Sequence, residues 1–185
     1  MKHPLMSAPF AKNKPIFWAF FLFTLAVMFC MNLVGKSLIT TAAPYGIVSY
    51  ELAGSVEKAQ QIIDSWNEDA RQYASFSLGF DYLFMVLYST TIALACLWGA
   101  LVLQARRVPG GRIGILLAWG LWLAAVFDGI ENIALSLILF NTPAAPWPQV
   151  AQVCAILKFL LIFLGLIFTF FAVIVRFWKR AEAGR

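Results

Sequence analysis

The segment IGILLAWGLWLAAVFDGIENIALSLILF, residues 113–140, is an apolar run long enough to cross a bilayer as a helix, which takes about 20 residues. Asp128, Glu131 and Asn132 interrupt this run within five residues. Positions three and four apart share one face of a helix, so the three side chains project the same way. An ionised carboxylate in hydrocarbon costs about 2.5–3.5 kcal/mol on insertion scales. The segment therefore predicts a membrane-spanning helix whose polar face points into the protein.

The composition of the whole chain is that of a polytopic membrane protein. Its 185 residues are 62% hydrophobic and 12% charged, with a mean hydropathy of +0.80, which no ordinary soluble domain of this size shows. Three more apolar runs, at about 16–40, 74–104 and 149–177, accompany the run at 113–140. The sequence predicts an all-α fold, a single domain over residues 1–185 built as a bundle of four transmembrane helices.

The connection between the first two runs has a different pattern. Its apolar residues recur at spacings of three and four, which indicates an amphipathic helix in the first external loop; they are Val56, Ala59, Ile63, Trp66, Ala70 and Tyr73. We interpret this helix as a solvated connector with one apolar face. The alternatives are that it lies flat on the membrane, extends the second span as a stalk, or covers the mouth of the bundle.

Basic residues are distributed asymmetrically among the loops. Ten flank the spans on one side, against the single acid Glu182: Lys2, Lys12, Lys14, Arg106, Arg107, Arg112, Arg176, Lys179, Arg180 and Arg185. The connection at 42–73 instead carries five acids and two basic residues: Glu51, Glu57, Asp64, Glu68, Asp69, Lys58 and Arg71. The positive-inside rule then predicts that both termini are cytoplasmic. The net charge of +5 is thus a topology signal, and we predict no nucleic-acid partner.

Every predicted span contributes polar residues to the same outer layer. They are Asn32 and Lys36 on the first span, Asp81 and Tyr88 on the second, Asp128, Glu131 and Asn132 on the third, and Lys158 on the fourth. We interpret this layer as an acidic ligand-binding cavity in the outer half of the bundle. The alternatives are that Lys36 reaches the headgroups and that Asp81 faces water at its helix start.

The predicted layer has an excess of negative charge. Three carboxyls against two ammonium groups leave a formal charge of −1, so a carboxyl is protonated or a cation enters. Lys158, about ten residues into its span, requires a carboxylate partner, which we predict to be Asp128 or Glu131. We expect Glu131, nearer the outer surface, to be the carboxyl without a fixed partner.

The sequence names no catalytic residue, cofactor or metal site. Its single histidine, His3, precedes the first span, which excludes histidine-based zinc, haem and general-base sites within the membrane. A Cys-x-x-Cys pair, a Gly-x-Ser-x-Gly elbow, a Walker loop and a His-x-x-Glu-His motif are all absent from the sequence. The Asp-x-x-Glu-Asn stretch in a four-span chain resembles small uncharacterised bacterial membrane proteins. That resemblance implies the bacterial cytoplasmic (inner) membrane and no particular activity.

Three hypotheses for the function follow. The first is binding or transport of a cation, a proton or a small amphiphilic ligand by the acidic layer. The second is an intramembrane enzyme that acts on a lipid-linked substrate through its carboxylates. The third is an accessory or structural subunit, in which the polar layer only fixes helix packing. The expected partners are the lipid bilayer, the ligand, and either further copies of the chain or a larger membrane complex.

Overall fold

The structure is a computed structural model that describes residues 3–7 and 14–182, with side chains at 3–6 and 14–178. It is 85% helix, and no strand occurs among the described residues. The predicted all-α class is therefore confirmed. Of the basic residues used for the orientation, Lys2, Lys12 and Arg185 lie outside the described residues, as do the side chains of Lys179, Arg180 and Glu182.

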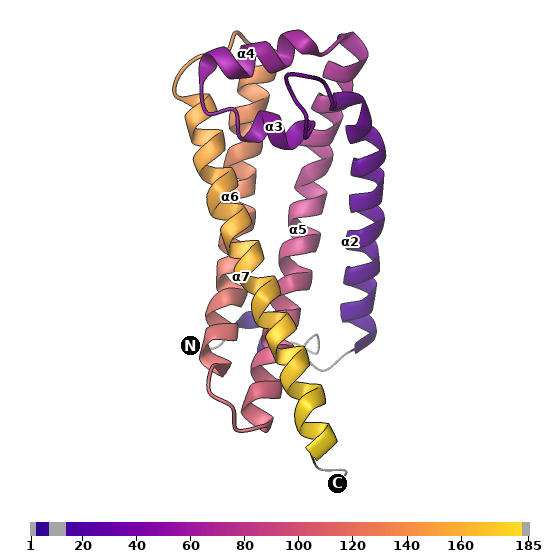
Figure 1. The fold of residues 1–185 in the computed structure, drawn as a ribbon, viewed down its shortest axis with the longest axis vertical. Coiled ribbons are helices and arrows are strands. Elements are labelled where there is room, and N and C mark those ends of the chain that lie inside the picture. The colour runs from indigo at the N-terminus through magenta and orange to yellow at the C-terminus, as the bar shows by residue number, and fades with distance from the viewer. Residues whose placement is uncertain (1–2, 8–13, 183–185) are drawn as a thin grey trace. The chain divides into compact units, whose positions relative to one another are not determined.

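The described part of the chain consists of helices of very different lengths (Figure 1). In order these are α1 (Pro4–Ser7), α2 (Lys14–Gly35), the 3-10 turn η2 (Lys36–Leu38), α3 (Ile47–Glu51), α4 (Val56–Ser65), α5 (Glu68–Ala105), α6 (Gly111–Phe140) and α7 (Trp147–Glu182). Four helical segments in the described residues are long and apolar enough to cross a membrane: Lys14–Leu38, Glu68–Ala105, Gly111–Phe140 and Trp147–Trp178. Each overlaps one of the four predicted spans.

The predicted amphipathic run at 56–73 is divided between two helices, which corrects the single helix expected from the spacing. α4 begins at the N-cap Ser55, whose side chain accepts a hydrogen bond from the Lys58 backbone N–H at 3.2 Å. It ends where Trp66 adopts an extended conformation. The Asn67 side chain then accepts the Ala70 backbone N–H at 2.8 Å, which caps the start of α5. The predicted second span, at about 74–104, therefore matches the apolar part of α5 but leaves out its polar first turn.

Two compact units make up the chain. We name the first the terminal unit (described residues of 1–23, 87–124 and 159–185) and the second the cap unit (24–86 and 125–158). The long helices pass from one unit into the other. The single domain over residues 1–185 stays a prediction.

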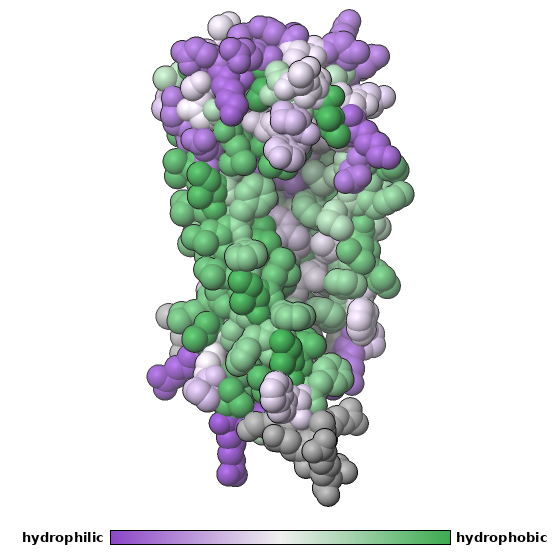
Figure 2. All heavy atoms as spheres, viewed as in Figure 1, coloured by the Kyte–Doolittle hydropathy of each residue, from purple (hydrophilic) through white to green (hydrophobic). Residues whose placement is uncertain are grey.

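The core of the cap unit forms between the connection at 38–66 and parts of α5, α6 and α7. Tyr50 OH donates a hydrogen bond to the Leu135 carbonyl at 3.0 Å, and Trp66 Nε1 donates to the Leu38 carbonyl at 2.9 Å. The Tyr50 and Trp66 rings lie 5.2 Å apart, edge to face. α4 buries one face, including Ile62, while hydrophilic residues gather over it on the surface (Figure 2). The connection thus packs apolar side chains into the core of the cap unit, while the polar face of α4 stays exposed.

The core of the terminal unit depends on close helix contacts at glycine. A Cβ atom on Gly114 would lie 2.6 Å from the Phe168 ring and 2.8 Å from the Cys96 carbonyl oxygen. A Cβ on Gly165 would lie 2.8 Å from Leu121. Small residues in membrane helices permit such close approach. These glycines let α5, α6 and α7 pack tightly within this unit.

Candidate functional site

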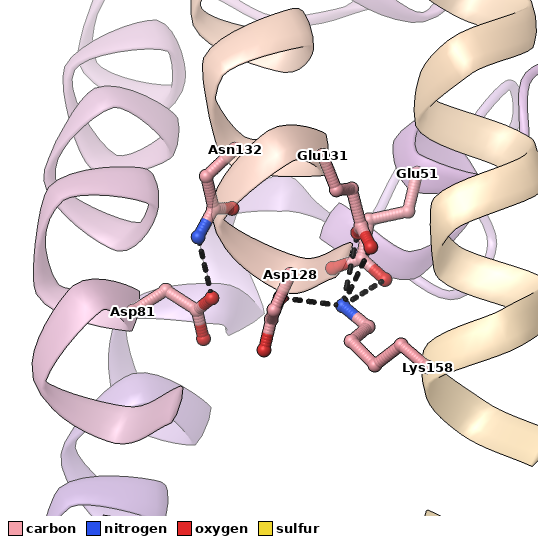
Figure 3. A network of polar contacts seen from close by, with 6 residues as sticks. All are labelled: Glu51, Asp81, Asp128, Glu131, Asn132 and Lys158. Atoms are coloured by element: carbon pink, nitrogen blue, oxygen red, sulfur yellow. Dashed lines mark hydrogen bonds and ion pairs between the residues drawn. The ribbon is translucent and has the colours of Figure 1, made fainter. Parts of the chain in front are cut away.

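A buried polar cluster lies in the cap unit (Figure 3). We name it the acidic cluster, and its six residues are Glu51 from α3, Asp81 from α5, Asp128, Glu131 and Asn132 from α6, and Lys158 from α7. The three α6 residues share one face of the helix, as their spacing predicts. All three are at most 3% exposed, and Lys158 is 5% exposed.

Lys158 is the centre of the acidic cluster. Its Nζ donates hydrogen bonds to Asp128 Oδ1 at 2.9 Å and to Glu131 Oε1 at 3.0 Å, and Glu131 Oε2 lies 2.9 Å away. The predicted pairing is therefore present, and it involves both acids rather than one. The expectation that Glu131 lacks a fixed partner is wrong, because Glu131 faces Lys158 with both of its oxygens.

Asp81 is held by Asn132 rather than by Lys158. Asn132 Nδ2 donates a hydrogen bond to Asp81 Oδ2 at 2.7 Å, which joins α6 to α5 (Figure 3). Asp81 is partly buried, whereas Asn132 is fully enclosed. Asn132 thus fixes the position of a carboxyl that Lys158 does not hydrogen-bond.

Glu51 is the member of the acidic cluster that sequence reasoning missed. Its Oε2 lies 3.7 Å from Lys158 Nζ, and this buried atom has no hydrogen-bond partner among the described residues. Burial raises the pKa of Glu51 above its usual value, Lys158 opposes that shift, and Asp128 adds to it. A signal did exist, because Glu51 stands alone between the apolar residues Tyr50 and Leu52.

The remaining predicted site residues lie elsewhere. Asn32 and Lys36 belong to the cap unit, but both side chains are exposed. The acidic cluster does not include them. Tyr88 is buried at 5% exposure and belongs to the terminal unit.

The six residues leave the acidic cluster strongly unbalanced. Four carboxyls and one ammonium give a formal charge of −3 when all are ionised, rather than the −1 expected from sequence. The difference arises because Glu51 joins the cluster and Lys36 does not. Within the described residues, no group of three His, Cys, Asp or Glu side chains is arranged to hold a metal ion.

No protein-family model, curated protein or solved structure matches this sequence. Lys158 Nζ donates hydrogen bonds to both Asp128 and Glu131. Glu51 and Asp81 lack such a hydrogen bond from an ammonium group. The arrangement can hold additional positive charge, as a proton on a carboxyl or as a small cation between carboxyls.

Proposed function

We propose that this chain is a small integral membrane protein whose acidic cluster binds a proton or a small cation. The observation that carries the proposal is the excess of three carboxyls over ammonium groups in a buried site. Buried charges are stable only when paired, and an uncompensated one is strongly destabilising. A proton or a small cation bound in the acidic cluster would offset this negative charge and so stabilise the folded protein.

The proposed membrane arrangement has four spans, with both termini in the cytoplasm of a bacterial cell. The four long apolar helices support the spans. Lys14, the loop at 105–112 and the end of α7 supply the basic residues expected on the cytoplasmic side. The cap of α3 and α4 then lies outside, and the acidic cluster lies toward that external side.

In this proposal, Glu51 and Asp81 are the carboxyls that take up the proton or the small cation. Lys158 hydrogen-bonds to Asp128 and Glu131, so its single positive charge is shared between those two carboxyls. Glu51 has a buried oxygen without a hydrogen bond, and Asp81 is bonded to a neutral amide. Asp81 is also partly exposed, which gives a proton or cation access to the acidic cluster.

The geometry favours binding over catalysis. An intramembrane enzyme would use Asp128 and Glu131 as acid and base, but each already lies within 3.0 Å of Lys158 Nζ. A general acid or base must instead reach its substrate at hydrogen-bond distance. Whether the bound charge also crosses the membrane depends on assembly with further copies of the chain or with a larger complex.

Potentiometric titration of the detergent-solubilised protein tests the proposal, with Na⁺, K⁺ or only a bulky organic cation present. We expect wild-type protein to bind protons, cations or both in amounts that Glu51→Gln and Asp81→Asn reduce. Glu57→Gln is the matched control, because Glu57 is an exposed carboxyl on α4. If each of the three variants differs from the wild type only by the loss of one carboxyl that titrates normally, the acidic cluster does not bind an extra proton or cation. The structural-subunit hypothesis would then replace this one.

A further inference from the structure

The histidine near the N-terminus occupies a buried aromatic site. His3 is 1% exposed, although its sequence position suggested a polar tail. Its ring centroid lies 4.7 Å from that of Trp119 and 4.6 Å from that of Trp122, with edge-type geometry in both contacts. Leu5 and Met6 pack against the core of the terminal unit beside it. A short segment preceding the first span is therefore docked onto α6.

A hydrogen bond to the His3 ring specifies the neutral imidazole. The Leu5 backbone N–H donates to Nδ1 at 3.3 Å, so Nδ1 is the unprotonated nitrogen. The proton of the neutral ring then lies on Nε2, which is buried and has no hydrogen-bond partner among the described residues. No part of the acidic cluster's chemistry uses this group.

Protonation is incompatible with this contact. A second proton on Nδ1 would point at the Leu5 N–H, which replaces a hydrogen bond by two opposed donors. The imidazolium would gain attraction to the indole rings, but its immediate surroundings are Trp119, Trp122 and the α1 backbone. Burial lowers the pKa of His3, and no charged side chain of the described residues offsets that effect.

We propose that the N-terminal segment is a pH-sensitive latch, which neutral His3 holds against Trp119 and Trp122 and protonated His3 releases. Because the docked state disfavours the proton, docking is strongest above the ordinary histidine pKa of 6.5. It weakens as the pH falls below that value. The latch depends on contacts within the terminal unit and is independent of the acidic cluster.

The chain offers a direct test, because His3 is its only histidine. Nuclear magnetic resonance of the imidazole in the full-length, detergent-solubilised protein reports its titration without assignment ambiguity. A spin label on Met6→Cys, with Cys30, Cys96 and Cys154 replaced by serine, reports docking through its mobility. We expect the imidazole to titrate below pH 6.5 and the mobile fraction of the label to rise several-fold over the same range.

Two substitutions separate the latch from a general effect of acid. His3→Asn keeps an acceptor for the Leu5 N–H, and His3→Phe keeps an aromatic ring. Neither side chain titrates, so at least one should keep the label immobile at both ends of the pH range. A His3 titration at or above pH 6.5 would overturn the proposal. So would a label whose mobility follows pH equally in the wild type and in both variants.

Discussion

Replacing Lys158 with methionine removes the one ammonium group of the acidic cluster. Lys158 makes hydrogen bonds of 2.9 Å to Asp128 and 3.0 Å to Glu131, and its side chain is 7% exposed. Breaking a buried pair by removing one partner costs about 3–5 kcal/mol, because the remaining charge is uncompensated. At about 2–4 °C per kcal/mol for a chain of this length, the melting temperature should fall by roughly 6–20 °C.

The loss should be reversible by removing the stranded charges. The triple variant Lys158→Met, Asp128→Asn, Glu131→Gln replaces the ionic network by neutral groups of similar volume, a change that is often close to neutral. It should therefore melt well above Lys158→Met alone. Acidic buffer should likewise narrow the deficit of the single variant, because protonation neutralises the two carboxyls.

Thermal melting in detergent, followed by circular dichroism, is the assay for this prediction. Lys58→Met is the matched control, because Lys58 is exposed on α4, and a surface substitution should change stability by less than about 0.5 kcal/mol. The reasoning is refuted if Lys158→Met melts like Lys58→Met. It is also refuted if the triple variant melts no higher than the single variant at neutral pH.

Three further predictions concern the cap and the helix contacts. The Glu51→Gln variant should become more stable relative to the wild type as the pH rises above 4.5, because the raised pKa of Glu51 means that its ionisation opposes folding. A difference in melting temperature between the two proteins that does not change with pH would contradict this prediction. Tyr50→Phe removes the hydrogen bond that Tyr50 OH donates to the Leu135 carbonyl, and it should cost about 0.5–1.5 kcal/mol in the same melts. A melting temperature equal to that of the wild type would contradict a stabilising role for this bond. Gly114→Ala should destabilise the protein, because the new Cβ would collide with the Phe168 ring and with the Cys96 carbonyl oxygen. Gly79→Ala is the control and should be neutral or stabilising, because a Cβ there meets no atom within 4 Å. Equal melting temperatures of the two variants would contradict the close helix contact at Gly114.

Hydropathy predicted the four long helices because each keeps enough apolar residues to cross a bilayer. The same signal misplaced the start of α5, since the residues from Glu68 onward are polar while still helical. Helical spacing also placed Asp128, Glu131 and Asn132 on one face. These predictions agree with the structure because they depend only on residues close together in the sequence.

The composition of the acidic cluster depended on contacts that spacing does not encode. Glu51 reaches Lys158 across more than a hundred positions in the chain, through a cap whose packing is set by side chains far from it in sequence. Asn32 on α2 and Lys36 on η2 were expected to join the polar layer, but their depth in the span does not determine which way their side chains point, and both are exposed. His3 is buried because two tryptophans on α6 receive it, which no local pattern indicates.

The most direct test of the central proposal is infrared spectroscopy of the carboxyl groups in purified protein at neutral pH. In buffer free of small cations, we expect an absorption band from a protonated carboxyl that Glu51→Gln or Asp81→Asn removes and Glu57→Gln leaves unchanged. Where a small cation binds, its addition should diminish the same band. A spectrum in which every carboxyl is ionised, and which no added cation alters, would contradict the proposal that the acidic cluster binds positive charge.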